Sequence, residues 1–308
     1  MDNKIIIQKI PRDYVMRWDH LRLNTNNLWE RDKLPRPSDY LSICDKFSTK
    51  NWIYKFHPES TIKTLVLDKE DIEWLTKAQQ IGQLTRKWSN LFQDELEELL
   101  QKYNHQTHWI SHSENGWFIR TPRVSLKFGQ FGPGPYHSLE NVIKSLVSST
   151  PTHLCFKPGC ESLTLYFMPF QPKLDSMKEF RIFVKDHKIT AISQQSLHRH
   201  SPWLNSLYEK GKLEEMITHK ILEPYEKLIL PKMKDYLDCY TMDFALIGDE
   251  LDPYFIEPNS FGRNYPAGSS LFDWDLDDKI LNSTNDDDTI YFRFTHDPEY
   301  LTYNKSLI

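Results

Sequence analysis

The sequence is poor in cysteine and lacks an excess of basic residues, and each shortage excludes a class of protein. Four cysteines in 308 residues cannot build a disulfide framework. Cys155 and Cys160 lack the second close pair that would complete a zinc site. We therefore expect the cysteines to be structural thiols. The net charge of -5 also argues against a broad nucleic-acid-binding surface.

Long apolar runs are missing as well. No stretch approaches the roughly 18 consecutive apolar residues of a membrane-spanning helix. The first residues, MDNKIIIQKIPRDYV, contain neither a long apolar segment nor a small-residue cleavage site, so they do not resemble a secretory signal. We expect a cytoplasmic monomer without a membrane segment.

The chain divides into four segments by pattern. Residues 1–42 are polar and interrupted by prolines, which predicts an irregular N-terminal arm. Residues 43–160 and 161–285 each mix helical and strand patterns, and we expect them to be two α+β lobes. Residues 286–308 are expected to be a C-terminal tail.

Local patterns predict several elements within the lobes. TIKTLVLD (61–68) and LTLYFMPF (163–170) are strand-like, and WSNLFQDELEELLQKYN (88–104) has one apolar helical stripe. Residues 179–195 predict a hairpin that turns at KDHK. Residues 239–259 predict a second hairpin that turns at Gly248 and Asp249. Residues 212–237 are expected to be helical, in two pieces because of Pro224 and Pro231.

The second hairpin carries a candidate metal site. Its arms bring Asp243 close to Glu257, and the Glu-x-Asn spacing points Glu257 and Asn259 to one face of a strand. Mg²⁺ favours such a sparse set of oxygen ligands, completed by phosphates and water. The pattern therefore predicts a magnesium site formed by Asp243, Glu257 and Asn259.

Residues upstream of this hairpin could hold a nucleotide. Arg120, Lys127 and Arg181 are candidates for neutralising phosphates, and Gly132 and Gly134 would let a loop lie close over a ligand. The apolar strand that contains Phe167 and Met168 could pack against an adenine base. Together these residues predict an ATP site.

Each feature taken alone also has a structural interpretation. Glu257 and Asn259 could cap a turn at the end of a strand. Arg181 could form an ion pair with Glu179 or Asp243, and the glycine segment could be an ordinary loop. An exposed loop explains His198-Arg199-His200 better than a substrate contact does. The order of the features along the chain is what favours a joint site.

That order resembles the ATP-grasp superfamily, and within it the chain is similar to the cell division cycle protein 123 family. The resemblance runs from FSTKNWIYKFHPESTIKTLVLDKEDIEWL through GWFIRTPRVSLKFG and EFRIFVKDHKITAISQQ. It ends at MDFALIGDELDPYFIEPNSFGRNYPAGSSLFDWDLDD. Glu257 departs from the Asp usual in that family, and the loop at 129–134 is richer in glycine. Residues 1–42 and the tail after about residue 285 have no counterpart that we can name.

The resemblance implies an ATP-grasp-like α+β fold in which two lobes hold ATP and Mg²⁺ between antiparallel sheets. It also implies a chaperone-like factor that assists assembly of eukaryotic translation initiation factor 2 by binding its gamma subunit. An active ATP-grasp ligase acting through an acyl-phosphate or adenylate is an open alternative, towards which Glu257 and the glycine loop lean. A third is a scaffold without nucleotide.

Overall fold

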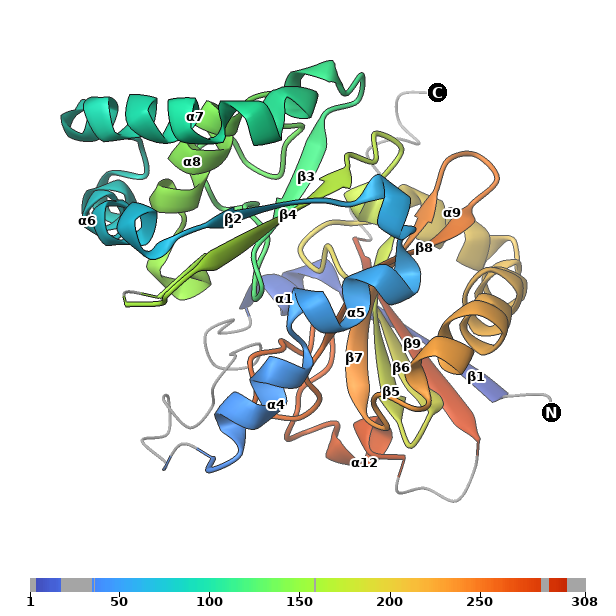
Figure 1. Cartoon of the computed structure of the whole chain (residues 1–308). Coiled ribbons are helices and arrows are strands. Elements are labelled where there is room, and N and C mark those ends of the chain that lie inside the picture. Colours follow the sequence, from blue (N-terminus) through green and yellow to red (C-terminus); the bar gives the residue numbers. More distant parts are fainter. Residues whose placement is uncertain (1–3, 18–34, 36, 158, 284–287, 298–308) are drawn as a thin grey trace. The chain divides into compact units, whose positions relative to one another are not determined.

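The computed structural model describes residues 4–17, 35, 37–157, 159–283 and 288–297. The chain forms two compact units. The first unit combines Met1–Phe47 with Lys173–Ile308, and the second is Ser48–Pro172. Figure 1 traces the elements of each unit along the chain.

The second unit is built around a three-stranded antiparallel sheet in the order β2-β4-β3. Alternate residues of these strands join the apolar faces of three helices in one core, which includes Leu65, Phe167, Ile72, Leu96 and Ile143. The strands are β2 (Lys63–Leu67), β3 (Trp117–Arg120) and β4 (Leu163–Pro169). The helices are α5 (Thr49–Phe56), α6 (Lys69–Thr85), α7 (Gln93–Thr107) and α8 (Leu139–Ser148). Short 3₁₀ turns are η1 (Glu59–Thr61), η2 (Asn90–Phe92), η3 (His108–His112) and η4 (Pro151–His153).

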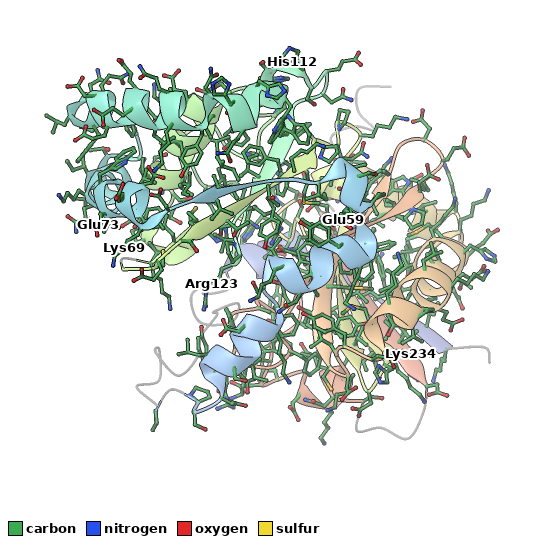
Figure 2. The ribbon with its side chains drawn as sticks, viewed as in Figure 1. Glu59, Lys69, Glu73, His112, Arg123 and Lys234 are labelled. Carbon is green, nitrogen blue, oxygen red and sulfur yellow. The ribbon has the colours of Figure 1, made fainter. Side chains whose placement is uncertain are left out.

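Helix α6 shows how local sequence fixes an element of this unit. Asp68 caps the helix by accepting from the backbone N–H of Asp71, and the side chain of Asp71 accepts in return from the backbone N–H of Asp68. Lys102 from α7 lies 2.6 Å from Asp68 and 3.1 Å from Asp71, which ties the two helices together. Charged side chains such as Lys69 and Glu73 cover the exposed face of α6 (Figure 2).

The first unit contains a six-stranded sheet in the order β1-β9-β6-β5-β7-β8. The hairpins β5–β6 and β7–β8 are antiparallel, as predicted, whereas β9 runs parallel to both β1 and β6. The sheet is therefore mixed. Its strands are β1 (Lys4–Pro11), β5 (Glu179–Lys185), β6 (Lys188–Gln194), β7 (Tyr240–Ile247), β8 (Asp252–Asn259) and β9 (Thr289–His296).

Different segments cover the two faces of this sheet. Phe180 packs against Trp203 of α9, while Phe183, which points to the other face, packs against Phe272 and Trp274. The helices of the unit are α1 (Arg12–Arg17), α4 (Tyr40–Lys46), α9 (Pro202–Glu209), α10 (Leu213–Ile217), α11 (Leu230–Met233) and α12 (Asp278–Leu281), with a 3₁₀ turn η5 (Ser176–Lys178). The same face as Phe183 carries the residues of the candidate site.

Helical structure continues from α10 through two π-helical segments, η6 (Thr218–Leu222) and η7 (Tyr225–Ile229), into α11. The predicted break at Pro224 and Pro231 is therefore wrong. A proline lacks the N–H that an α-helix needs, and the wider π turns accommodate that loss without ending the helix.

The unit boundaries differ from the four predicted segments. Strand β4 pairs with β2 and β3 and so belongs with residues 48–172, not with the C-terminal lobe. The predicted arm contains β1 and the predicted tail contains β9. These two strands pair along their whole lengths, so both segments contribute to the sheet of the first unit. The rest of the arm from 18 to 34 and the tail beyond residue 297 lie outside the described residues.

All four cysteines are free, and burial raises the pKa of Cys155 to about 11, which agrees with a structural thiol. In the described part of the chain, no helix is long and apolar enough to cross a membrane.

Candidate nucleotide and metal site

The predicted metal residues share one face of three neighbouring strands. Arg181 of β5 lies opposite Asp243 of β7, and Asp243 lies opposite Glu257 of β8. Asn259 lies two residues along β8, opposite Thr241. Since side chains alternate along a strand, all of these project to the same side. The prediction that the two arms pair and bring Asp243 next to Glu257 is confirmed.

Arg181 and Asp243 form a nearly buried, two-pronged ion pair. Nε and Nη2 of Arg181 donate to Oδ1 and Oδ2 of Asp243, each at 2.9 Å. The Nη1 group donates to the carbonyl of Gly268 at 2.7 Å. The side chains are only 11% and 7% exposed. Burial alone would lower the pKa of Arg181, but the charges of Asp243 and Glu257 outweigh it and raise that pKa.

This geometry settles one alternative that the sequence left open. The ion pair predicted for Arg181 exists, and its partner is Asp243 rather than Glu179. The guanidinium is committed to a carboxylate and a carbonyl, so its role in this arrangement is to position Asp243. These bonds use three of the five N–H groups of Arg181.

The donor set fits a magnesium ion that is shared with a phosphate. Glu257 lies opposite Asp243 on the same face, and its charge acts on Arg181. Asn259 Nδ2 lies 3.5 Å from Asp243 Oδ2, so its amide oxygen is the atom left to face a cation. In the described part of the chain, no three His, Cys, Asp or Glu side chains form a metal cluster. A cation here would need phosphate and water to complete its shell, which is the habit of Mg²⁺.

Thr241 is a member of this face that the sequence reasoning missed. The residue is fully buried, and its Oγ1 makes no hydrogen bond with any described residue. An unsatisfied buried hydroxyl is costly. Its position two residues before Asp243 on a strand was the available signal. The hydroxyl adds a polar group next to Asn259.

The predicted basic residues of the second unit have different environments. Arg120 is buried, its guanidinium lies 5.1 Å from the ring of Trp52, and Nε approaches Thr49 Oγ1 at 3.5 Å. Lys127 is exposed, with its ammonium 5.5 Å from the ring of Phe128. Of the two, only Lys127 presents its charge to solvent.

The glycine loop does not present its backbone to a ligand at residues 129–132. The N–H groups of Gly129 and Gly132 donate to carbonyls within the loop. Those of Gln130 and Phe131 donate to the hydroxyls of Ser148 and Ser145 on α8. Gly132 and Gly134 have positive φ values of 66° and 115°, so the loop uses glycine for its turns. A phosphate cradle at these N–H groups is therefore not supported.

Phe167 and Met168 point to opposite faces of β4, as neighbours on a strand must. Phe167 is fully buried in the core, with ring centroids 4.9 Å from Trp109 and 6.3 Å from Trp117. The sequence analysis predicted that Phe167 and Met168 both contact one adenine base. Because the two side chains lie on opposite faces of the strand, that prediction is corrected. Met168 alone lies on the face away from that core.

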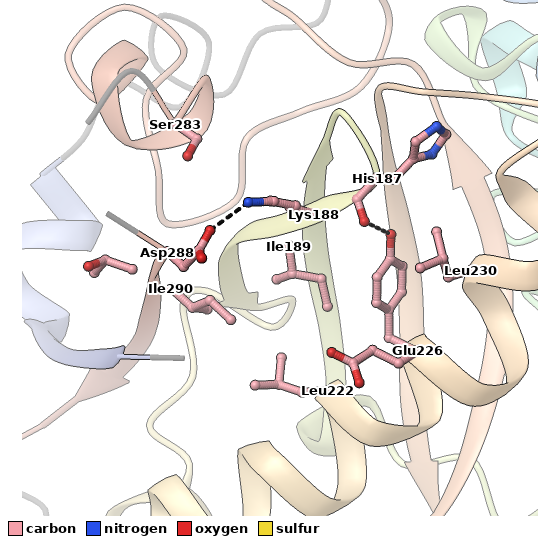
Figure 3. A pocket seen from close by; sticks show the side chains of 11 residues that line it. His187, Lys188, Ile189, Leu222, Glu226, Leu230, Ser283, Asp288 and Ile290 are labelled. Carbon is pink, nitrogen blue, oxygen red and sulfur yellow. Dashed lines mark hydrogen bonds and ion pairs between the residues drawn. The ribbon is translucent and has the colours of Figure 1, made fainter. Parts of the chain in front are cut away.

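The first unit also contains a cavity of about 360 Å³, shown in Figure 3. It lies between the turn of β5–β6, the π-helical segments and the start of β9. The ion pair of Lys188 with Asp288 and the hydrogen bond from Tyr225 to the His187 carbonyl border it (Figure 3). None of the predicted site residues lines this cavity.

Comparison with known proteins agrees with the resemblance drawn from the sequence. Residues 158–306 match the D123 family model. A curated Candida albicans protein, "Translation initiation factor eIF2 assembly protein", is 36% identical over 98 residues, which are 31% of this chain. The chain spans only 25% of that relative's length by this match.

Two solved structures share the fold. Cdc123 from Schizosaccharomyces pombe matches with a TM-score of 0.52, and its C-terminally truncated form matches with 0.50. Both are 15% identical and cover 82% of this chain, and the matches span 97% and 96% of the solved chains. This likeness shows that the chain shares the mixed α+β fold of these structures, which is the fold that the sequence resemblance implies.

Proposed function

We propose that the chain is a member of the D123 family, whose model matches residues 158–306, and that it is an assembly factor for translation initiation factor eIF2. The observation that carries this proposal is the sequence match to a relative named for eIF2 assembly. The sequence resemblance adds the finer expectation that the client is the gamma subunit and that the protein acts in the cytoplasm.

We also propose that the protein binds ATP with Mg²⁺ at the face formed by β5, β7 and β8. Glu257 and the amide oxygen of Asn259 would hold the cation, together with the lone pairs of Asp243 that Arg181 leaves free. Bound Mg²⁺ would supply positive charge that links these oxygens to the phosphates. The shared face of Asp243, Glu257 and Asn259 and the unsatisfied Thr241 hydroxyl opposite Asn259 support this proposal.

In this scheme Arg181 keeps Asp243 oriented. Bound nucleotide would act as a conformational clamp through its binding, and not through its hydrolysis. The protein would have a form that holds its client and a form that does not. Nucleotide would favour the first form to the extent that it binds that form more tightly than the second.

Reconstitution tests the assembly function. The purified gamma subunit would be mixed with the other eIF2 subunits, with and without this protein, and the yield of the complete complex measured by native mass spectrometry. We expect the protein to raise the yield or the rate of assembly. An unchanged yield at every concentration of the protein would overturn the assembly role, whatever the outcome for nucleotide.

A further inference from the structure

Two segments of the second unit join to form one surface that the nucleotide site does not use. Arg86, just after α6, donates from Nη2 to the carbonyl of Phe128 at 2.5 Å. The backbone N–H of Trp88 donates to Gln130 Oε1 at 2.7 Å. These bonds fasten residues 84–91 to the glycine loop at 127–134.

Large apolar side chains are exposed on both segments. Leu84 and Leu91 are 86% and 77% exposed, and Phe128 and Phe131 are 45% and 43% exposed. Single exposed apolar residues are common, but such a group on two joined segments is typical of a protein interaction site. We call Leu84, Leu91, Phe128 and Phe131 the aromatic–leucine platform.

The backbone under the two phenylalanines is held firmly. Gln130 and Phe131 donate to hydroxyls of α8. Gly129 lies so close to that helix that an added Cβ would be 2.4 Å from the carbonyl oxygen of Ser145. The loop can therefore not be a mobile flap at this point. A fixed backbone lowers the entropy cost of presenting these side chains to a partner.

The two segments carry three basic residues, and the acidic start of α7 at Asp94 and Glu95 follows the first segment. Arg86, Lys87 and Lys127 form no ion pair with any residue that the structure describes. Lys144 is paired with Glu140, and its ammonium lies 5.9 Å from the ring of Trp88. The indole N–H of Trp88 is buried and donates to no described residue. Acceptor groups with negative charge are the missing complement.

We propose that the platform is a docking surface for an amphipathic segment of another protein that carries acidic residues beside apolar ones. Its apolar side chains would contact Leu84, Leu91 and the two phenylalanines. Its carboxylates would face Arg86, Lys87 and Lys127. This surface is independent of the nucleotide site and does not rest on the assembly function.

Fluorescence anisotropy with designed peptides tests the docking surface. The probe is a labelled helical peptide of leucine, phenylalanine, glutamate and alanine, and its control has lysine in place of every glutamate. We expect the full-length protein to bind the acidic peptide, with weaker binding as salt is raised, and not to bind the lysine peptide. Absence of binding, or equal binding of both peptides, would overturn the proposal.

Variants then locate the binding. Leu84→Ser with Leu91→Ser should raise the Kd by at least about tenfold, and Arg86→Glu with Lys87→Glu should do the same. The matched control is Leu276→Ser, because Leu276 is 80% exposed but belongs to the other unit. An equal loss in this control would contradict the surface. Self-association that the Leu84 and Leu91 changes abolish would show that a second copy, not an acidic segment, occupies it.

Discussion

Arg181 and Asp243 face each other across β5 and β7 and share two parallel hydrogen bonds of 2.9 Å. This pair lies in the centre of the face that carries the candidate metal ligands. The carboxylate of Asp243 is both the ion-pair partner of Arg181 and a candidate metal ligand. A change at this pair should therefore affect the stability of the sheet and the geometry of the site together.

Removing the guanidinium should be strongly destabilising. Arg181→Ala leaves the carboxylate of Asp243 buried without its partner, and such a change costs about 3–5 kcal/mol. Urea unfolding of the first unit, followed by near-UV circular dichroism, measures the loss. The double variant Arg181→Met with Asp243→Leu should recover most of the stability, because both charges are then gone. A double variant no more stable than Arg181→Ala would speak against the pair as the cause.

Magnesium and ATP should stabilise the protein through Glu257 and Asn259. At about a hundredfold excess of ATP over its Kd, the free energy of unfolding should rise by about 2.7 kcal/mol. Glu257→Gln and Asn259→Ala should each remove most of the corresponding thermal shift. Glu250→Gln is the matched control, since Glu250 is exposed near the turn of the same hairpin. A full shift in the Glu257→Gln variant would contradict the ligand assignment.

The cap of α6 should make the second unit sensitive to acid. Lys102 and the capping bonds lower the pKa of Asp68. The stabilisation is therefore present above the unfolded pKa of about 4 and is lost as the pH falls below it. Asp68→Ala should cost about 1 kcal/mol at neutral pH. Asp68→Asn should keep the cap yet weaken the acid dependence, and acid titration of helicity distinguishes the two.

His200 and His296 in the first unit should also make the stability of the protein depend on pH, over a higher pH range than Asp68 does. Burial lowers the pKa of His200, and the nearby charge of His296 lowers it further. Burial also lowers the pKa of His296, and the charge of Lys9 adds to this effect. His200 Nδ1 accepts from the backbone N–H of Asp297, so a proton on that nitrogen removes the bond. Because the unfolded state binds the protons more readily, stability should fall as the pH drops below about 6.5.

Thermal midpoints between pH 7.5 and 5.5 test the histidine effect. The wild type should lose stability over this range, and the loss should be smaller in His296→Gln. His105→Gln, on the exposed side of α7, should leave the pH profile unchanged. An identical profile for His296→Gln and the wild type would remove the histidine pair from the account.

The hairpins and the carboxylate face were predictable because their signals are local. Alternation and turn residues fixed both hairpins, and the spacing of Glu257 and Asn259 put them on one face of β8. The same alternation rule separates Phe167 from Met168, so the joint adenine assignment could have been avoided.

Other features depend on contacts that sequence pattern does not encode. The pairing of β1 with β9 joins residues near both ends of the chain, and nothing local distinguishes such a strand from an arm or a tail. The glycine loop looks free in sequence, but Ser145 and Ser148 of α8 take its N–H groups. Whether Arg181 faces a phosphate or Asp243 depends on strand register, which becomes definite only in the folded sheet.

Direct binding to eIF2 subunits tests the central claim most closely. The purified protein would be titrated into the isolated gamma subunit and, separately, into the other subunits, with binding followed by isothermal titration calorimetry. The account predicts saturable binding to the gamma subunit, strengthened by ATP and Mg²⁺ and less strengthened in Glu257→Gln. No detectable binding to any eIF2 subunit, by a protein that is folded and binds nucleotide, would contradict it.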